Sequence, residues 1–525
     1  MADDDTQERA VEAELADAQR ARRGRRIEFY GGPAASAIPI ALFIAWAVFQ
    51  SGLMRIGDTT GLVAGMLVSL IVGMFFAKGD WKTYANTIFE GMTQRVAATA
   101  IVAWLWAGMF ADTIQAGGFV GGLVWAAEAL NVGADLFPAI TFLLAALLAT
   151  GIGTGYGTAI AFTGLFFPAG LLVGANPTLL FGAILSGAVF GDNLAPVSDT
   201  TIVSAVTQDA DIGGVVASRF KYAIVAASLA FVGYLIAGNA MEGIEIAGGS
   251  DVLAGQAEPL GLVHLISIAV VIGTAIQGRH IVEAVSWGLL FSFVINVALG
   301  LAPVSDMLVF RAPANVALAK TAADVLPFVT TVPVTSGNVG VGGSIYSGAA
   351  GFFPLIVLTL LIVAGAQIMI RGGGFAAVQN WLLNRVATGV RRAETTMVLG
   401  TAMVNAMITI NTAAEIAIAP YVARIGERFN VNGYRRANIL DANTSALGYI
   451  FPWAGGVLVG YAEMRSLLGA EGFDWFTREM LVNPGDVWPF VFHGWLLFFV
   501  FLLSAWTGFG LEYVSDRESE EVARV

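Results

Sequence analysis

The sequence contains no cysteine, only three histidines and few charged residues. Without cysteine the chain forms neither disulfides nor thiolate metal sites. The histidines, His264, His280 and His493, are widely separated and lack metal-ligand spacing, so we expect them in loops or at a membrane interface. Charged residues make up 13% of the chain and hydrophobic residues 57%, whereas a soluble domain is roughly 25% charged. This composition excludes an ordinary soluble domain.

Motifs of hydrolases and of nucleotide-binding proteins are also missing. The sequence has no GxSxG and no HExxH pattern. Its glycine-rich stretch TGIGTGYGT looks like a phosphate loop, but it contains no GK[ST] and follows no predicted strand. The basic residues fall in loops without a nucleic-acid-binding module. We therefore expect no enzyme activity, no cofactor and no nucleic-acid partner.

What the chain does have is a series of long apolar runs between residues 34 and 510. A helix of about 20 apolar residues crosses a hydrocarbon core of roughly 30 Å, and continuous runs favour helices over an alternating barrel pattern. The sequence predicts an all-α integral membrane protein with about ten transmembrane helices. The predicted spans are 34–53, 59–77, 96–116, 178–206, 220–239, 262–279, 281–302, 348–370, 440–461 and 488–510.

Two further apolar segments, 137–175 and 397–424, are interrupted midway by TGIGTGYGT and TINTAAE. Each has room for two short helices, and we interpret both as re-entrant hairpins. This topology puts most basic loops, including Arg219, inside and the acidic segments 117–136, 241–260 and 462–486 outside, as the positive-inside rule requires. Counting either hairpin as one crossing would reverse every later loop.

The two ends of the chain are polar. Residues 1–33 and 511–525 are expected to be charged cytoplasmic tails of a cell-membrane protein, because Arg22, Arg23, Arg25 and Arg26 directly precede the first span. The net charge is -12, with 4 Lys against 23 Arg. The acidic tails and loops are either ordinary solvated ends or the hydrated surface of a protein from a salt-loving organism.

Internal similarity divides the chain into two halves. Three features recur in the same order at nearly one separation: IQAGGF as IRGGGF, Pro168 as Pro420, and Asp192 as Asp441. We expect inverted repeats with interrupted helices, which are typical of secondary transporters with a site at the membrane midplane. The repeats are 96–240 and 348–510, with two leading helices in 34–95 and linking helices and an outer loop in 241–347. A second copy of LAPVSD, at 301–306, breaks this offset and is interpreted as coincidence.

Carboxylates inside the membrane are candidate functional groups. An ionisable side chain there costs roughly 2.5 to 3.5 kcal/mol on insertion scales, so it usually faces protein or water. Asp112 and Glu283 lie near span ends, where we expect them to snorkel to the interface. The other four, Asp192, Asp199, Glu415 and Asp441, lie at helix interruptions.

The stretch FGDNLAPVSDTT is the first of these interruptions. Gly191 and Pro196 argue against an unbroken helix, and an unwound stretch exposes carbonyl oxygens. Together with Asp199 and the neighbouring hydroxyls, these oxygens suit a small alkali cation. In the alternative interpretation Asp199 only caps the second half-helix. The predicted sodium ligands are Asp199, Ser198 and Thr200.

The other interruptions supply further polar side chains, and we expect all four to converge near the membrane centre. The complete set of candidate ion-binding residues is Asp192, Asn193, Ser198, Asp199, Thr200, Thr201, Thr154, Thr158, Asn411, Thr412, Glu415, Asp441, Asn443 and Thr444.

These motifs resemble those of a known family. FGDNLAPVSDTT is similar to the GDK-SP-SDTT signature of the NhaC-type sodium/proton antiporters of the ion-transporter superfamily. TGYGT resembles the Gly/Thr-rich hairpin of that family, and TSALGYIFPW resembles its TS-LIPW stretch. The likeness spans most of residues 34–510. The family also includes malate/lactate exchangers, so the fold does not settle the substrate.

Three positions depart from the family pattern. Asn193 stands where the family usually has Lys, which removes a cation beside Asp192. Ala454 stands where the family usually has Asn, and Glu415 where a neutral polar side chain is expected. This branch therefore distributes charge differently.

The resemblance implies exchange of sodium (or lithium) ions for protons by alternating access. Asp199, and with it Asp192, would bind either a sodium ion or a proton. A free Asp titrates at about 3.9; desolvation raises the pKa of a carboxyl and a bound cation lowers it, and this opposition couples the two ions. Thr154, Thr158, Asn411 and Thr412 would close the site from the hairpin tips.

Two other functions stay open. The first is a sodium- or proton-coupled carrier of a small organic anion or an amino acid, which the lack of an obvious intramembrane Arg or Lys weakens. The second is an ion channel, which would not need two inverted halves. Small cations and the lipid bilayer are the expected partners, and a homodimer is compatible with the sequence.

Overall fold

The structure is a computed structural model that describes most of the chain. The described residues are 26–79, 81–196, 198–246, 257–277, 279–334, 338–381, 385–470 and 472–514. The predicted tails lie mostly outside these ranges, including Arg22, Arg23 and Arg25.

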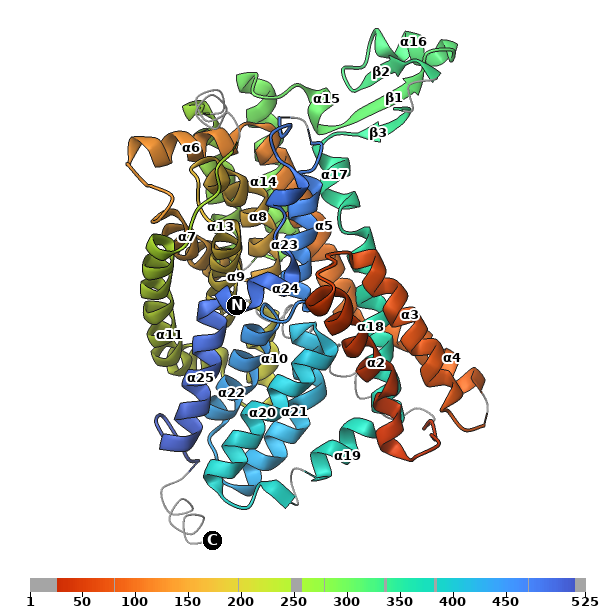
Figure 1. Cartoon of the computed structure of the whole chain (residues 1–525), viewed down its shortest axis with the longest axis vertical. Helices are drawn as coiled ribbons and strands as arrows, with labels where there is room; N and C mark the ends of the chain where they lie inside the picture. Colours follow the sequence, from red (N-terminus) through yellow and green to blue (C-terminus); the bar gives the residue numbers. More distant parts are fainter. Residues whose placement is uncertain are drawn as a thin grey trace.

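The described part is built almost entirely from helices (Figure 1). Eight helices or helix runs are long and apolar enough to cross a membrane, and four shorter apolar helices accompany them. The chain is therefore a multi-pass membrane protein, as predicted. The prediction of ten spans is not confirmed among the described residues, because the helices Thr59–Phe75 and Pro259–Ala275 are shorter than 18 residues and the predicted span 440–461 is broken into Gly433–Leu447 and Gly455–Ser466.

The first half of the helical core runs from α5 to α11. Its elements are α5 (Arg95–Ala116), α6 (Phe119–Ala129), α7 (Phe137–Ile152), α8 (Gly155–Leu172), α9 (Pro177–Leu194), α10 (Asp199–Thr207) and α11 (Ile212–Ala240).

The second half repeats this order of long helix, short helix, helix pair, broken helix and long helix. Its elements are α18 (Phe353–Arg371), α19 (Gly374–Trp381), α20 (Val390–Ile408), α21 (Asn411–Arg428), α22 (Gly433–Leu447), α23 (Gly455–Ser466) and α25 (Phe492–Thr507). Before α25 come three short elements, η6 (Arg478–Met480), α24 (Pro484–Val487) and η7 (Trp488–Phe490).

The two halves point in opposite directions. The short helix α6 lies near the top of the molecule, whereas its counterpart α19 lies near the bottom (Figure 1). The long helices α11 and α25 that close the halves pack against each other. This arrangement is the one expected of inverted repeats. That the pairs α7/α8 and α20/α21 are re-entrant stays a prediction.

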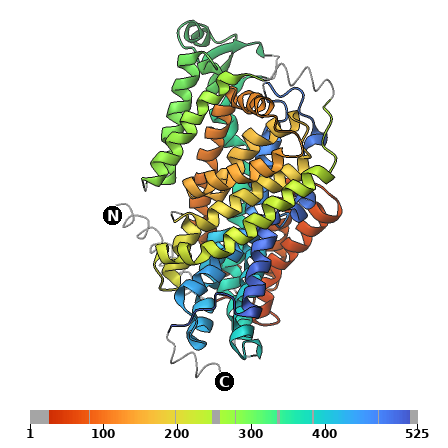
Figure 2. The same ribbon diagram turned by 90° about the vertical axis from the view of Figure 1, so that its left-hand side faces the viewer.

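Helices before and between the halves complete the bundle. The leading elements are η1 (Pro33–Ala37), α2 (Ile38–Ala47), the π-helical turn η2 (Val48–Leu53), α3 (Thr59–Phe75) and α4 (Trp81–Met92), and α3 and α4 pack on α18. Helix α4 is not among the predicted helices, because its mixed polar and apolar residues form no long apolar run. The linking elements η3 (Pro259–His264), α13 (Leu265–Ile276) and α14 (Ile281–Leu299) follow α11, and α13 pairs with α14 at the edge of the bundle (Figure 2).

The helical architecture includes one small three-stranded sheet among the described residues, in the loop between α14 and α18. Strand β1 (Val309–Pro313) pairs in parallel with β2 (Val329–Val332) and antiparallel with β3 (Gly340–Gly342). Three short helices belong to the same loop: α15 (Val304–Met307), α16 (Ala317–Ala323) and α17 (Ser344–Ala350). The second LAPVSD copy lies here, at the end of α14 and in α15, away from the predicted site.

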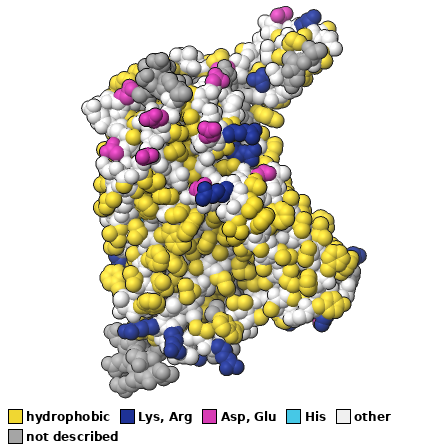
Figure 3. All heavy atoms as spheres, in the orientation of Figure 1, with side chains coloured by type: hydrophobic (Ala, Val, Ile, Leu, Met, Phe, Trp, Pro, Cys, Tyr) yellow, Lys and Arg dark blue, Asp and Glu magenta, His cyan; other side chains and the backbone are white. Residues whose placement is uncertain are grey.

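The surface carries the pattern of a membrane protein. A broad apolar region covers the middle and lower part of the face in Figure 3. Lys and Arg side chains lie along its lower edge and also in the upper part, whereas the Asp and Glu side chains of this face lie in the upper part alone. The C-terminal end of the described chain is at the lower, basic end (Figures 1 and 2).

Glycines let α9 approach α7 closely. A Cβ on Gly187 would lie 2.4 Å from Ala145 Cβ and 2.8 Å from the Ala146 backbone nitrogen, and one on Gly191 would lie 2.4 Å from the Thr150 nitrogen. Gly187 and Gly191 form a GxxxG pair, the spacing that lets membrane helices pack backbone to backbone. This contact holds the end of α9, and with it Asp192, beside the first hairpin.

We expect Gly187→Ala to lower the thermal unfolding temperature of the detergent-purified protein. The added methyl group overpacks the α7/α9 contact, which costs about 1–3 kcal/mol. Gly273→Ala in α13 is the matched control, since a Cβ there meets nothing within 4 Å and alanine favours a helix over glycine. Equal unfolding temperatures for Gly187→Ala and the wild type would contradict the close approach.

Candidate functional site

The structure has four breaks in the helices of its two halves. In the first half α7 ends at Gly153, with a φ of 80°, before α8 begins, and α9 is separated from α10 by residues 195–198. In the second half α20 ends at Thr409, with a φ of 64°, and α22 is separated from α23 by residues 448–454. Each break frees backbone groups from helical hydrogen bonds.

All four breaks meet at the carboxylate of Asp192, which is 3% exposed. Its Oδ1 accepts from the Gly155 N–H at 3.4 Å and from Ser198 Oγ at 2.9 Å. Its Oδ2 accepts from Asn411 Nδ2 and from the Tyr449 hydroxyl, each at 3.3 Å. The donors come from both halves, and all of them are neutral. Asp192 is thus held by hydrogen bonds without a bonded counter-charge.

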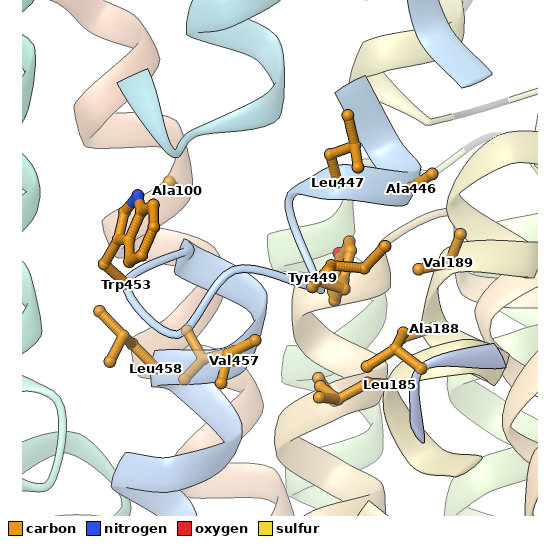
Figure 4. Close-up of a cluster of buried hydrophobic side chains, with 14 of the residues drawn as sticks. Ala100, Leu185, Ala188, Val189, Ala446, Leu447, Tyr449, Trp453, Val457 and Leu458 are labelled. Carbon is orange, nitrogen blue, oxygen red and sulfur yellow. The ribbon is translucent and has the colours of Figure 1, made fainter. Parts of the chain in front are cut away.

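Tyr449 reaches this carboxylate from the loop between α22 and α23. Figure 4 shows that loop beside apolar side chains of α9, including Leu185, Ala188 and Val189. The Tyr449 ring also packs against Tyr156 of α8, with ring centres 5.5 Å apart. Apolar packing therefore positions a polar contact between the two halves.

Asp199 is the first residue of α10 and is partly buried. The Thr412 hydroxyl, at the start of α21, donates to its Oδ2, and the Thr200 N–H lies 3.0 Å from its Oδ1. Ser198, rather than Asp199, occupies the N-cap position, and its hydroxyl lies 3.0 Å from that of Thr200. The carboxylate reaches across to the second half, which argues against a purely capping role.

Asp441, the counterpart of Asp192, lies in a different environment. Arg219 of α11 forms an ion pair with its Oδ2, and both side chains are fully buried. Thr201 Oγ1 donates to the same oxygen at 3.1 Å, and Ser445 Oγ donates to Oδ1 at 2.7 Å.

Arg219 is anchored on several sides. Its Nε donates to Asn438 Oδ1 at 3.1 Å, and its Nη1 donates to the carbonyl of Asn193 at 2.5 Å. The sequence predicts Arg219 in a cytoplasmic loop and offers no obvious intramembrane cation. Arg219 lies instead within α11 and is completely buried, and no sequence signal separates it from an ordinary basic residue near a helix start.

Glu415 and the rest of the second half complete a polar cluster. Thr444 Oγ1 donates to Glu415 Oε1 at 2.7 Å, and Asn405 Nδ2 donates to the carbonyl of Thr444. Asp192, Asp199, Glu415 and Asp441 are close enough for their charges to interact. We call these four side chains the carboxylate cluster. Among the described residues that bond to it, Arg219 carries the single positive charge, so the cluster fits bound cations or protons.

Several buried oxygens beside this cluster have no hydrogen-bond partner in the described part of the chain. They are Asn193 Oδ1, Asn405 Oδ1, Asn411 Oδ1, Asn443 Oδ1 and Glu415 Oε2. A buried acceptor without a donor is costly. All five have lone pairs of the kind that hard cations bind.

The structure gives other candidates local roles. Thr154 accepts from the Gly157 N–H at 3.3 Å, and Thr158 Oγ1 donates to the carbonyl of Thr154 at 3.0 Å. The amide nitrogens of Asn193 and Asn443 donate one turn back on their own helices, to Val189 at 3.2 Å and Ile439 at 2.6 Å. These residues shape the breaks rather than bonding to the carboxylates.

Three expectations about residues outside the cluster need correction. Asp112 does not snorkel, because it is 6% exposed and accepts from Ser347 Oγ at 2.5 Å. His264 and His493 are fully buried, not in loops or at an interface. His264 Nε2 lies 2.9 Å from Asn296 Oδ1. The His493 ring packs between those of Phe142 and Phe190. Glu283 is partly exposed and pairs with Arg279 at 3.5 Å, as an interfacial residue would.

No group of three His, Cys, Asp or Glu side chains that could hold a metal ion occurs among the described residues.

Comparison with known proteins agrees with this architecture. A model of a family described as "Na+/H+ antiporter family" matches residues 27–239 and 315–495.

Three curated relatives are also similar. The Malate-2H(+)/Na(+)-lactate antiporter of Bacillus subtilis is 26% identical over 38% of this chain, and the Arginine/ornithine antiporter ArcD of Halobacterium salinarum is 25% identical over 46%. The Na(+)/H(+) antiporter NhaC of Alkalihalophilus pseudofirmus is 21% identical over 31%. The alignments cover 42%, 50% and 34% of those three proteins, half their length or less.

We expect Arg219→Met to destabilise the protein by about 3–5 kcal/mol, because it leaves Asp441 buried without its counter-charge. Thermal unfolding in detergent measures the effect. Lys221→Met is the control: the Lys221–Glu512 pair is partly exposed, at 3.4 Å, and such pairs contribute about 0–1 kcal/mol. Arg219→Met combined with Asp441→Asn should recover much of the loss. Equal stability of the two single variants would contradict the assignment.

Proposed function

The chain belongs to the Na+/H+ antiporter family, and on that premise we propose that it is a secondary active transporter that exchanges sodium ions for protons. The observation that carries the proposal is the carboxylate cluster. Four interacting carboxylates share one bonded guanidinium, and buried acceptor oxygens lie beside them. Such a cluster is stable when it holds cations or protons.

Competition between the two ions would supply the coupling. A carboxylate in a dry, low-dielectric site favours its neutral protonated form, whereas a sodium ion beside it favours the charged form. One carboxyl group therefore releases its proton when sodium arrives and takes a proton when sodium leaves. Asp199 and Asp192 are suited to this role, because every side chain bonded to them is neutral.

Sodium is the cargo in this proposal. Its ligands would be Asp199, Ser198 and Thr200, with Asp192 as a neighbouring carboxylate. Ser198 Oγ already lies within 3.0 Å of both Asp192 Oδ1 and the Thr200 hydroxyl. Asn193 and Asn411 would add amide oxygens that have no other partner in the described chain.

Alternating access would come from movement between the two halves. Arg219 and Thr201 of the first half bond to Asp441 of the second half. Three further contacts cross at the other two aspartates: Asn411 and Tyr449 with Asp192, and Thr412 with Asp199. These are single hydrogen bonds to carboxylates. Loading a proton or a sodium ion on the carboxylate changes them directly, which links the occupied state to the closure of the halves.

The proposed location is the cell membrane, with both termini in the cytoplasm. The basic lower edge in Figure 3 supports this orientation, since Lys and Arg are enriched in cytoplasmic loops. An acidic, Lys-poor composition supports a protein that works in high salt.

One observation favours a second candidate, a sodium- or proton-coupled exchanger of a small organic anion or an amino acid. Arg219 is buried beside the cluster, and its Nη2 has no hydrogen-bond partner among the described residues. A guanidinium edge can bind a carboxylate. Two of the relatives are named for malate and lactate, or for arginine and ornithine.

We expect Asp199→Asn to abolish sodium-driven proton movement. The purified protein is placed in liposomes that have an acidic lumen with a pH-sensitive dye, and sodium chloride is added outside, so that sodium entry drives protons out. Wild type should alkalinise the lumen without any organic acid. The amide introduced at position 199 carries no charge to neutralise sodium and no carboxyl proton to release, so the rate should fall at least about tenfold, the effect of roughly 1.4 kcal/mol.

Asp306→Asn is the matched control, because Asp306 ends the same hexapeptide, LAPVSD, in the outer loop and should leave exchange unchanged. Full pH-dependent exchange by Asp199→Asn would show that Asp199 is not the carboxylate that exchanges sodium for a proton. If the wild type alkalinises the lumen only when malate, lactate or an amino acid is supplied, the result favours the exchanger of an organic substrate.

We expect Asn411→Ala to raise the sodium concentration at half-maximal exchange about tenfold. It removes a donor to Asp192 and an amide oxygen, and one lost hydrogen bond to a charged group corresponds to about 1.5–3 kcal/mol. Asn239→Ala is the control, since Asn239 is exposed and bonds only one turn back, to Leu235 at 2.8 Å. An unchanged sodium dependence in Asn411→Ala would remove Asn411 from the site.

A further inference from the structure

A second pair of buried carboxyl groups lies apart from the carboxylate cluster. Asp112 of α5 is 6% exposed and Glu463 of α23 is 1% exposed. Glu463 lies eight residues into α23, or about 12 Å along the helix from the break at 1.5 Å per residue. The sequence predicts Asp112 at the interface and Glu463 in an acidic outer segment, and it indicates neither their burial nor their pairing.

The two carboxyl groups are within hydrogen-bond reach of each other. Apart from that mutual contact, Asp112 Oδ1 and Glu463 Oε1 have no hydrogen-bond partner in the described part of the chain. An ionised carboxylate only accepts hydrogen bonds, so a bond between two carboxyl groups needs a proton on one of them. Two buried carboxylates without that proton would repel each other.

Packing around the pair holds it in place. Helices α5, α8, α17 and α23 pack together here. Glu463 Oε1 lies 2.5 Å from the position of a Cβ on Gly164, so α8 admits this carboxyl group only because residue 164 has no side chain. The buried hydroxyl of Thr163, which also has no partner among the described residues, lies 3.2 Å from the Cβ position of Gly460, one turn before Glu463.

One side chain links the pair to the surface. Ser347 Oγ donates to Asp112 Oδ2 at 2.5 Å, and Ser347 is exposed on α17, just after the outer sheet. A hydroxyl can both accept and donate a proton. Ser347 therefore offers a route by which a proton reaches Asp112 from the end of the molecule that carries the sheet.

Other ionisable groups on the surrounding elements have partners of their own or are exposed. Tyr461 donates to the carbonyl of Gly57, and Arg465 lies 3.8 Å from Asp58. Tyr156 accepts from the Asn411 N–H at 3.4 Å, and His264 lies 2.9 Å from Asn296. Asp306 accepts from Ser305 at 3.3 Å, and Tyr346 is 49% exposed.

From this geometry we propose that Asp112 and Glu463 form a second proton-binding site, in which the two carboxyl groups share one proton. The proton lies on one carboxyl group and is accepted by the other, and it leaves through Ser347 when the pair ionises. The use of this site in transport rests on the proposed sodium/proton exchange. The site itself does not, because it needs only the two carboxyl groups and their burial.

Infrared spectroscopy of the reconstituted protein, recorded over a range of pH in water and in deuterium oxide, tests the proposal. A protonated carboxyl group has a carbonyl stretch that a carboxylate lacks. We expect a carboxyl band at low and neutral pH that shifts in deuterium oxide and disappears as the pH rises. Glu463→Gln and Asp112→Asn should each remove that band.

Both substitutions should still fold. The amide introduced at position 463 can donate to the Asp112 carboxylate as the protonated Glu463 does, and the amide introduced at position 112 can in the same way donate to an ionised Glu463, so that neither variant needs a carboxyl proton. Glu283→Gln is the control, because Glu283 is partly exposed and paired with Arg279, and it should leave the band in place. If the wild-type spectrum contains no band that both substitutions remove, the proposal of a shared proton is wrong. A band that stays constant over the whole pH range in which the protein is folded would overturn reversible binding.

This measurement needs neither sodium nor transport. Loss of the band in both variants, with no sodium/proton exchange in liposomes, would preserve the proton-binding site and refute the proposed function. Sodium/proton exchange in liposomes without the carboxyl band would support the proposed function and refute the second proton-binding site.

Discussion

Hydrogen bonding of carboxylates away from water governs the architecture of this protein. A buried carboxylate is costly unless donors or a counter-charge compensate it. An intact helix offers few donors, because its N–H groups are already bonded along the axis. The chain interrupts α7/α8, α9/α10, α20/α21 and α22/α23, and contacts from all four breaks reach Asp192. The breaks and the carboxylate therefore require each other.

The two halves repeat the same elements, yet they handle the equivalent carboxylates differently. Asp441 is paired with Arg219 and bonded to Thr201 and Ser445, which fixes its charge and its position. Asp192 has four neutral donors and no bonded cation. A paired carboxylate is a structural anchor, whereas a carboxylate held only by neutral groups can exchange a proton for another cation. This asymmetry inside a repeated fold is the basis of the proposed mechanism.

Close helix packing makes the asymmetry possible. Glycines at 187 and 191 bring α9 against the backbone of α7, and the missing side chain at Gly164 admits Glu463 beside α8. Water is kept from both carboxyl sites in this way, so the charge on each side chain depends on its immediate partners. The Asp112–Glu463 pair has a route to the exposed surface through Ser347, whereas the carboxylate cluster lies where the two halves meet.

The amino-acid sequence was sufficient to predict the class of the protein, the positions of the breaks and most of the polar residues at them. Long apolar runs predict spanning helices, and glycine, proline and carboxylates within those runs mark interruptions, because each is unfavourable in an apolar helix. Which groups are partners became visible in the folded protein alone. Arg219 is ordinary in sequence, at the start of α11, but pairs with Asp441, and Glu463 lay in an acidic stretch assigned to the outer side. Pairing depends on distances between helices far apart in the chain, and hydrophobic periodicity records only which residues are apolar.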